Sequence, residues 1–507
     1  MQLQSSADDP YKRPLRLLEP PGDWQTTIAK LVSANNTDGG VSVMVCGPKG
    51  AGKSTFCRML ANALLPMVPK THQDGVQPQG YDTVGFLDLD PGQPEFSPPG
   101  ELSLLKLKMY NLGPPFTHPT ACGDNETIKA HHFGYLSPKD NTHYYYQCAL
   151  DLYSHYRRTA TSPLIINCSG WVQGSGLEVL TDLVHGLCLT NIIYLSTTGP
   201  QEVLGALEGA ASRSNVPLHQ LTSQLSEFPT RTAADQRMMS TLSYFHMHGV
   251  EGGNIRWNAS PLTNMAPLVV PYEGPKQAIL AIMVLGDEQN PEFYDSLLEG
   301  CVVGIAVIQQ DPVVFGRSSK GSDDKMTAME GQILPKQGHP FQAFEQDGLQ
   351  TPESGPILRT ASGISYLRAP GHSVHPLPPA SSYSLGQAIV RGVDTTTKTF
   401  HLLTPIPSET FRSLHQQNCK ILLVRGRLDT PIWAYTEQLA LGKGRRLRRE
   451  RETGEKEVYT PDDVDKWAEK QPWASIVEGG RSRSGKARRI RRDIRYRSQG
   501  RGDVGSV

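Results

Sequence analysis

The sequence predicts an α/β protein built on a P-loop parallel sheet flanked by helices, followed by a smaller β-rich C-terminal domain and a charged tail. Three observations predict this class. A glycine-rich loop at residues 47–55 joins a short apolar segment to a segment with helical spacing. Apolar strand segments then alternate with amphipathic helices, which implies a parallel sheet with right-handed crossovers. After about residue 265, strand segments follow one another without regular helices between them.

The N-terminal half is taken first. Residues 1–37 are polar and form an entrance segment or linker, in which Asp23 caps a helix that runs to Leu31. Residues 38–265 form the P-loop domain. Its expected strands are residues 41–46, 83–90, 162–168 and 191–196, and its expected helices are residues 56–65, 144–157 and 177–188. Glycine-rich or acidic breaks follow these strands, and in such sheets ligands bind at the carboxyl ends of the strands.

The C-terminal half divides into three parts. Residues 266–440 are the β-rich domain, with strands expected at residues 278–285, 302–308, 388–393 and 421–425. Within it, residues 316–382 are rich in Ser, Gly, Pro and Gln, which predicts a mobile insertion. Residues 441–507 are highly charged, which predicts a partly disordered tail. The basic stretch 481–497 is either a nuclear targeting signal or an RNA contact, and composition does not choose between them.

Composition excludes several classes. The chain has 507 residues, with 50 Lys+Arg and 50 Asp+Glu, so it is not a generally basic nucleic-acid coat. Eight cysteines without a C-x-x-C pair favour a reduced intracellular protein without a structural zinc site. The apolar runs are too short to cross a bilayer, and the polar start is not a secretory signal. A chain of this length is expected to contain two or three domains.

The glycine-rich loop has the spelling of a phosphate-binding loop. Its glycines let backbone N–H groups surround phosphate oxygens, and the following helix N-terminus adds positive partial charge. Lys53 would reach the β- and γ-phosphates of ATP, and the Ser54 hydroxyl would hold Mg²⁺. The alternative is a plain glycine turn ahead of a helix. The nucleotide-binding residues are Gly47, Pro48, Lys49, Gly50, Ala51, Gly52, Lys53, Ser54 and Thr55.

A second motif, DLDPGQPE at residues 88–95, ends the second expected strand. Asp88 and Asp90 are two residues apart, so they share one face of that strand. Two carboxylates beside a P-loop are placed to contact Mg²⁺ and a reacting hydroxyl. Asp88 is the candidate Mg²⁺ ligand. Gln93 could orient a water molecule or the metal shell. The alternative is a strand end carrying solvated aspartates.

Two further stretches carry candidate substrate contacts. The glycine-rich GWVQGSG at residues 170–176 offers Trp171 as a flat stacking surface for a base, unless its indole only covers the sheet edge. Thr232 and Asp235 have capping-box spacing, so a helix begins there. Arg231 and Arg237 flank that start and could reach phosphate as a lid closes; the alternative is a pair of solvated arginines.

Together these four stretches resemble the polynucleotide 5′-hydroxyl kinase family, which includes the kinase of the pre-mRNA cleavage factor and the nucleolar pre-rRNA-processing kinase. The resemblance covers residues 20 to about 265 well and residues up to 440 more loosely. It implies an ATP-dependent transfer of the γ-phosphate to the 5′-OH of RNA. By this resemblance Lys53 is the P-loop lysine, Ser54 the Mg²⁺ ligand and Asp90 the general base. Gln93 belongs to the shell around the metal and the hydroxyl. Trp171, with Gly170 and Gly174, is the RNA clasp, and Arg231 and Arg237 are the lid arginines.

The resemblance also implies a setting. Processing of the internal transcribed spacer of pre-rRNA in the nucleus and nucleolus is the expected role, in a higher-order complex with a Las-type HEPN endonuclease. Two short segments, residues 433–435 and 472–473, resemble the part that engages that partner, unless the tail is simply charged and disordered. The family carries a β-rich domain before the P-loop, whereas 46 residues precede it here, so the sequence is either a piece of a longer chain or lacks that domain.

Two rival functions remain open at this stage. A GTPase-like switch is one, because Asp90 and Gln93 echo the Asp-x-x-Gly-Gln of GTPases; the echo is one residue short, and no Asn-Lys-x-Asp is present to bind guanine. A non-catalytic scaffold that holds nucleotide for stability is the other. Transfer of label from ATP to 5′-OH RNA separates the kinase from both.

Overall fold

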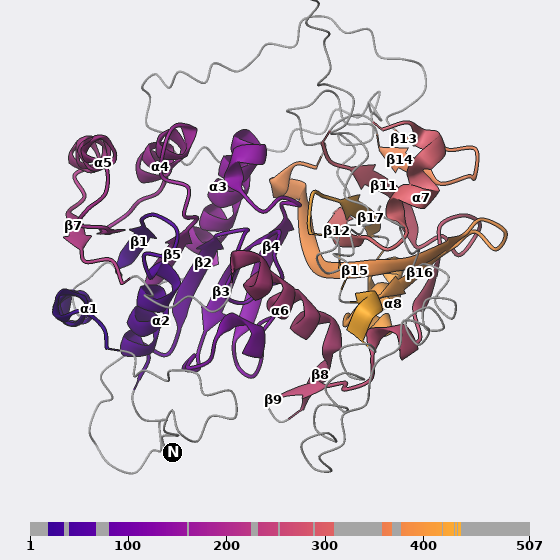
Figure 1. The fold of residues 1–507 in the computed structure, drawn as a ribbon, viewed down its shortest axis with the longest axis horizontal. Helices are drawn as coiled ribbons and strands as arrows, with labels where there is room; N and C mark the ends of the chain where they lie inside the picture. Colours follow the sequence, from indigo (N-terminus) through magenta and orange to yellow (C-terminus); the bar gives the residue numbers. More distant parts are fainter. Residues whose placement is uncertain are drawn as a thin grey trace, which may run out of the picture. The chain divides into compact units, whose positions relative to one another are not determined.

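The strands of the protein form two large sheets and one small two-stranded ribbon, and helices accompany the sheets (Figure 1). The computed structural model describes residues 19–34, 40–66, 81–159, 162–224, 232–251, 254–286, 289–308, 357–367, 377–417, 419–429, 431–432 and 434–437. All of these except Glu437 lie in the first of two units, Met1–Thr436. Within the described part, no helix is both long and apolar enough to cross a membrane.

The first sheet has seven strands in the order β4-β3-β2-β5-β1-β6-β7. Five of them are parallel, as the sequence predicts: β1 Ser42–Cys46, β2 Val84–Leu89, β5 Leu164–Cys168, β6 Asn191–Leu195 and β7 Leu218–Leu221. All side chains of β1, β2 and β5 are buried, which is typical of a sheet covered by helices on each side. The carboxyl ends of β1, β2, β5 and β6 therefore share one edge.

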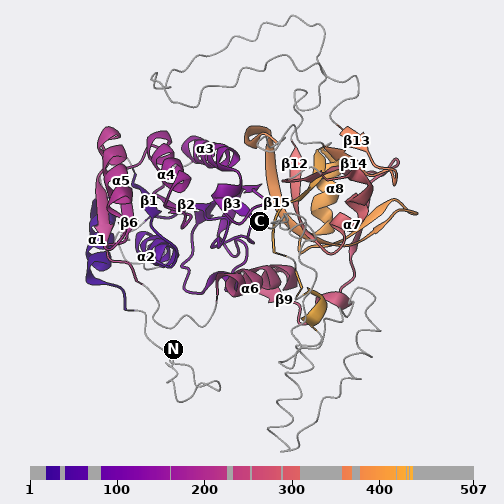
Figure 2. The same cartoon turned by 45° about the horizontal axis from the view of Figure 1, so that its top comes forward.

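Helices cover both faces of this sheet (Figure 2). Helices α1 Gly22–Ala34 and α2 Lys53–Leu64 pack on one face, where Val43, Val45 and Phe86 point. On the other face, Met44 and Leu87 contact α3 Thr142–Thr159, α4 Ser175–Gly186 and α5 Gln201–Arg213. Successive strand residues thus feed two separate cores. The amphipathic helices expected in this half are confirmed, within a few residues at each end.

The sheet also has an antiparallel edge, which the sequence analysis did not predict. Strands β3 Glu101–Leu107 and β4 Glu126–His132 pair antiparallel to β2 and to each other. The pattern of β4 is mostly polar, so apolar periodicity did not predict it. Polar contacts hold β4 in place of an apolar stripe. His132 Nδ1 lies 2.8 Å from Glu101 Oε1 on β3, and His131 Nε2 lies 2.8 Å from Asp151 Oδ2.

The second sheet confirms the β-rich part. It has eight strands in the order β10-β16-β15-β12-β17-β11-β14-β13, mostly antiparallel, with β11 parallel to both of its neighbours. The strands are β10 Leu268–Pro271, β11 Ile279–Val284, β12 Val302–Ile308, β13 Ile357–Arg359, β14 Ser365–Leu367, β15 Ser382–Asp394, β16 Thr399–Leu403 and β17 Lys420–Arg425. Two helices that the sequence did not predict accompany it, α7 Tyr294–Leu298 and α8 Ser408–Gln416.

The expected mobile insertion, residues 316–382, needs correction. Strands β13 and β14 fall inside it, and β15 begins at its last residue. Strands β13 and β14 are only three residues long. Tyr366 and Leu367 of β14 are buried, and this burial explains why the two strands stay in the sheet although their composition is typical of a loop. Residues 316–356 and 368–376 lie outside the described residues.

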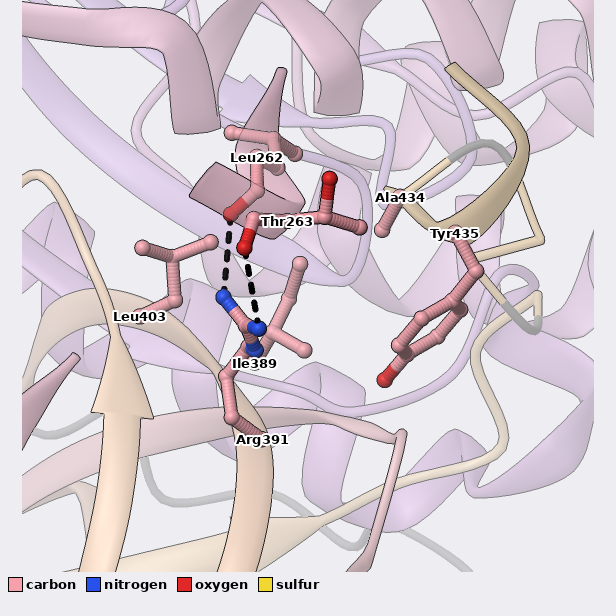
Figure 3. A pocket seen from close by; sticks show the side chains of 7 residues that line it. All are labelled: Leu262, Thr263, Ile389, Arg391, Leu403, Ala434 and Tyr435. Carbon is pink, nitrogen blue, oxygen red and sulfur yellow. Dashed lines mark hydrogen bonds between the residues drawn. The ribbon is translucent and has the colours of Figure 1, made fainter. Parts of the chain in front are cut away.

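One arginine ties together the segments that follow α6 Ala233–His246. After α6 the chain forms the ribbon of β8 Met247–Glu251 and β9 Asn254–Trp257 and then a short turn. Arg391 of β15 donates to the carbonyls of Leu262 (3.0 Å), Met265 (3.2 Å) and Thr263 (3.2 Å) of that turn. Figure 3 shows the guanidinium of Arg391 beneath the carbonyls of Leu262 and Thr263, with the Tyr435 ring lining the same small pocket. Arg391 directs these donors to backbone carbonyls, and the residues that line the pocket include no carboxylate, so these contacts support the fold.

Candidate nucleotide and polynucleotide site

The phosphate-binding loop lies between β1 and α2, as predicted. Gly47, Gly50 and Gly52 have φ values of 146°, 77° and 98°, which disfavour residues with a side chain. A Cβ at Gly47 would also lie 2.9 Å from the carbonyl oxygen of Leu195 on β6. The loop therefore depends on glycine both for its conformation and for the close approach of a neighbouring strand end.

Lys53 opens helix α2 and is buried, with 6% of its surface exposed. Its Nζ donates to the carbonyl of Pro48 at 3.1 Å, inside the loop. Burial lowers the pKa of Lys53 below its ordinary value, and the nearby Asp90 carboxylate opposes that shift. The hydroxyl of Ser54, the next residue, is on the first turn of α2 and half-buried. A buried cation at a helix N-terminus is ready for an anionic ligand.

Trp24 of α1 braces this loop, a contact that sequence reasoning missed. Its indole Nε1 donates to the Thr222 carbonyl after β7 at 2.7 Å, and its ring meets Phe56 edge-on at 5.4 Å. A Cβ on Gly52 would lie 2.7 Å from its ring. No local sequence pattern marks this contact, because Trp24 and Thr222 are 198 residues apart in the chain.

The two aspartates of the DLDPGQPE motif differ sharply. Asp88 is fully buried; its Oδ1 accepts from Asp90 N (3.3 Å) and Asn167 Nδ2 (3.0 Å), and its Oδ2 accepts from Glu95 N (2.6 Å). Asp90 is half-exposed, and its Oδ1 accepts from the N–H groups of Gly92 (3.0 Å) and Gln93 (3.3 Å). This arrangement leaves Asp90 Oδ2 without a hydrogen-bond partner among the described residues.

The candidate metal ligand Asp88 is enclosed by its own chain in this structure, and its role toward Mg²⁺ stays a prediction. A carboxylate that is 0% exposed and accepts three hydrogen bonds from its own chain acts as the core of the turn. Burial raises its pKa from 3.8 to about 8, outweighing the N–H groups of Glu95 and Asp90 and the Asn167 amide, which favour the ionised form. Among the described residues, no group of three or more His, Cys, Asp or Glu side chains could hold a metal ion.

We expect the stability of the protein to reveal this buried carboxyl through pH. The folded protein keeps the Asp88 proton up to about pH 8, whereas the unfolded chain releases it near 3.8. The contribution of that proton is complete below the unfolded pKa and is lost as pH rises through the folded pKa. Relative to Asp88→Asn, the wild type should lose up to about 1.4 kcal/mol of unfolding free energy per pH unit from about pH 5 to 8, and no more above it.

Urea unfolding of both proteins across this range, without nucleotide and with a chelator, measures the effect. The substitution also aims an amide at the Glu95 N–H, which adds a loss that does not change with pH. Asp140→Asn, at an exposed aspartate, is the control and should show a difference that does not vary with pH. A pH-independent difference for Asp88→Asn contradicts the prediction.

The loop after β2 reaches two further elements. Gln93 Nε2 donates to Gln236 Oε1 on α6 at 2.9 Å, so the expected shell residue contacts the helix that the sequence placed in a lid. Glu95, which the sequence analysis did not single out, is 2% exposed and binds Arg58 of α2 through two hydrogen bonds of 3.0 and 3.1 Å. The turn that carries Asp90 is thus fixed to both helices.

The glycine-rich stretch after β5 lies against the P-loop. A Cβ on Gly170 would come within 2.6 Å of Lys49 Cγ and 3.0 Å of Lys49 N. Trp171 is half-buried, and a Cβ on Gly176 would lie 2.8 Å from its indole Cδ2. Gly174 has a φ of 57° and caps the start of α4. The stretch therefore brings Trp171 to the strand edge that carries the P-loop and Asp90.

The two expected lid arginines have different outcomes. Thr232 and Asp235 form the predicted capping box at the start of α6. Arg237, in the first turns of that helix, pairs with Asp429 at 2.9 Å, so in this structure it contacts the segment after β17. Arg231 lies outside the described residues, as do Trp433 and the predicted partner segment at residues 472–473.

The chain is similar to several known proteins. Residues 47–247 match the family model described as mRNA cleavage and polyadenylation factor CLP1 P-loop. The chain is 36% identical to polynucleotide 5′-hydroxyl-kinase grc3 of Aspergillus fumigatus, over 91% of this chain and 57% of that protein. It is 32% identical to polynucleotide 5′-hydroxyl-kinase GRC3 of Gibberella zeae, over 95% of this chain and 64% of that protein. A solved complex of Clp1p with Pcf11p is 14% identical, over 79% of this chain and 78% of that one, with a TM-score of 0.46.

The chain thus spans 57% and 64% of the lengths of these two curated relatives. The matched family segment contains the P-loop, the acidic turn, the Trp171 stretch and α6. Residues 47–247 of this chain are therefore similar to the CLP1 P-loop family model, and most of the chain is similar to the curated polynucleotide 5′-hydroxyl-kinases named grc3.

Proposed function

We propose that the protein is an ATP-dependent polynucleotide 5′-hydroxyl kinase that transfers the γ-phosphate of ATP to the 5′-OH of RNA. One observation carries the proposal: the half-exposed Asp90 carboxylate lies close enough to Lys53 of the P-loop that its negative charge raises the pKa of that lysine against the effect of burial. A phosphate site and a hydrogen-bonded carboxylate with one oxygen to spare are the groups that phosphate transfer to an alcohol needs. The names of the curated relatives support the same activity.

In this mechanism Asp90 acts as general base. The N–H groups of Gly92 and Gln93 hold its Oδ1, so Oδ2 accepts the proton of the 5′-hydroxyl. The 5′-oxygen bonds to the γ-phosphorus while the bond from that phosphorus to ADP breaks, and the proton remains on Asp90. Lys53, held at the loop by Pro48, exchanges that contact for the β- and γ-oxygens and offsets the charge that develops there.

The residues present fit Mg²⁺ as a bound cofactor. The ion commonly takes few protein oxygens and completes its shell with water and substrate phosphate, and the Ser54 hydroxyl at the start of α2 is such an oxygen. When bound, the ion neutralises charge on the β- and γ-phosphates. Asp88 contributes by shaping the Asp90 turn, which is our proposal in place of direct ligation.

Trp171 is proposed as the stacking surface for the first bases of the RNA. Trp171→Ala should weaken RNA binding by about 1–3 kcal/mol, the value of one stacked base, and leave ATP affinity unchanged. Trp171→Phe should retain most of the affinity. Fluorescence anisotropy with a 5′-OH oligonucleotide measures both.

Trp257→Ala is the matched control, because Trp257 is an accessible indole (45% exposed) that lies on the β8–β9 ribbon. It should bind RNA like the wild type. If Trp171→Ala binds RNA with unchanged affinity, the stacking role is wrong.

The proposed setting follows from the resemblance described above. We propose a nuclear and nucleolar role in processing the internal transcribed spacer of pre-rRNA, where the substrate is a fragment with a 5′-OH left by cleavage. A Las-type HEPN endonuclease is the proposed partner, in a higher-order complex. Co-purification from nuclear extract, and accumulation of unphosphorylated spacer fragments when the protein is depleted, test these proposals.

The deciding experiment is a transfer assay. The protein is incubated with γ-labelled ATP and a 5′-OH RNA, with the same RNA bearing a 5′-phosphate as control, and with and without the endonuclease. Label on the first RNA alone supports the kinase. RNA-independent hydrolysis with a preference for GTP would support a GTPase-like switch, and nucleotide binding without either reaction would support a scaffold.

A further inference from the structure

A buried ion pair joins the P-loop helix to the turn that carries Asp90. Arg58 of α2 donates from Nε to Glu95 Oε1 at 3.0 Å and from Nη2 to Glu95 Oε2 at 3.1 Å. The side chain of Glu95 is 2% exposed and that of Arg58 is 21% exposed. Arg58 Nη2 also lies 2.8 Å from Glu95 Oε1, so several short contacts between these planar groups hold the pair in one orientation.

Glu95 is held from every side. Its Oε1 also accepts from Asn111 Nδ2 at 2.8 Å and lies 3.1 Å from His118 Nε2. Its backbone N–H donates to Asp88 Oδ2 at 2.6 Å, which closes the turn between Asp88 and Glu95. Movement of Glu95 would therefore move Asp90, which lies inside the same turn.

Arg58 connects this turn to the phosphate site through one turn of helix. It follows Ser54 by four residues, so both side chains lie on the same face of α2. Lys53 and Ser54 at the start of α2 set where phosphate sits, and Arg58 sets where Glu95 sits. The distance between the phosphate and the Asp90 carboxylate is then set by α2 and this ion pair.

We propose that Arg58 and Glu95 are a positioning pair that fixes the general base relative to the nucleotide, an inference that rests on the kinase function proposed above. Stability alone does not account for the pair, because a buried ion pair contributes little more than well-packed apolar residues of similar volume. What it provides is a fixed geometry. Phosphate transfer depends on such geometry, since displacement of a reacting group by about 1 Å can slow a reaction about 100-fold.

The test uses Arg58→Lys, which keeps the charge but not the paired hydrogen bonds, Glu95→Gln, and the double variant. For each, kcat, the KM for ATP, the Kd and stoichiometry of ATP binding, and the melting temperature are measured. We expect kcat to fall about 10- to 100-fold, as for a misplaced reacting group, with the Kd for ATP changed less than about threefold and one nucleotide bound per chain. The losses of the two single variants should not add in the double variant.

The exposed pair Arg359–Glu273, at 3.2 Å, is the matched control. Arg359→Lys and Glu273→Gln change the same residue types in the β-rich part and should leave kcat unchanged.

Three outcomes overturn the proposal. Unchanged kcat does so directly. A fall in ATP-binding stoichiometry that equals the fall in kcat does so too, because the pair then only maintains the fold and each folded molecule reacts normally. If the wild type phosphorylates no 5′-OH polynucleotide, the kinase function fails and the positioning role falls with it, whereas an active wild type with unaffected variants rejects the positioning role alone.

Discussion

Asp90→Asn is expected to bind ATP like the wild type and to lose phosphate transfer. The asparagine keeps Oδ1, so the N–H groups of Gly92 and Gln93 still have their acceptor and the turn persists. In place of Oδ2 it presents an amide, which cannot take a proton from the 5′-hydroxyl. General-base catalysis contributes about 10²–10⁴-fold to such reactions, so single-turnover transfer should slow by that factor.

Single-turnover transfer from labelled ATP to a 5′-OH oligonucleotide, together with calorimetric titration of ATP, measures both effects. Asp394 offers a matched control, because its Oδ1 accepts from Thr396 N (2.8 Å) and Thr397 N (3.0 Å) in a turn of the same kind. Asp394→Asn should transfer phosphate at the wild-type rate. An Asp90→Asn protein that retains its transfer rate would exclude Asp90 as the base.

The parts of the site that could be predicted from the sequence are local. Strand, glycine loop and helix follow one another at residues 42–64, and the glycines sit where the backbone adopts positive φ. The capping box of Thr232 and Asp235 spans four residues and formed as expected. Each of these patterns is complete within one stretch of chain, so no knowledge of the tertiary contacts was needed.

The difference between Asp88 and Asp90 could not be predicted in this way. The two residues share one strand face by spacing, yet one is the core of a turn and the other is half-exposed. Asn167 at the end of β5 and the N–H of Glu95 decide which is which, through contacts across the sheet edge. Sequence spacing placed both carboxylates near Mg²⁺ and a reacting hydroxyl, whereas their hydrogen-bond partners show which of the two is enclosed.

The same limit applies to the contacts that hold the site together. Trp24, Arg58 and Glu95 carry no motif of their own, and their partners lie 198 and 37 residues away. The antiparallel edge was missed for a related reason, because polar pairs such as His131 with Asp151 support β4 in place of an apolar stripe. Supporting contacts depend on the fold, so they become visible only after it.

Lys53→Met is expected to remove nucleotide binding without destabilising the empty protein. Burial lowers the pKa of Lys53, because charging a buried ammonium group costs free energy. The folded protein therefore keeps its full stability above the unfolded pKa of this lysine and loses part of it as pH falls through the folded pKa. The one hydrogen bond of Lys53 among the described residues, to the Pro48 carbonyl, offsets only part of this cost at neutral pH. Methionine fills similar space without a charge, so the variant should melt at the same temperature as the wild type or higher.

The nucleotide reveals what the lysine is for. At an ATP concentration of about 100 times its Kd, binding should stabilise the wild type by about 2.7 kcal/mol, and Lys53→Met should gain nothing at the same concentration. Thermal unfolding with and without Mg-ATP measures this, and Lys49→Met, at an exposed lysine of the same loop, should keep most of the shift. A Lys53→Met protein that melts well below the wild type would show that the lysine supports the fold. Equal stabilisation of both proteins by ATP would show that Lys53 does not bind phosphate. If the prediction holds, the free-energy cost of burying this cation in the empty protein is explained by its binding of an anion.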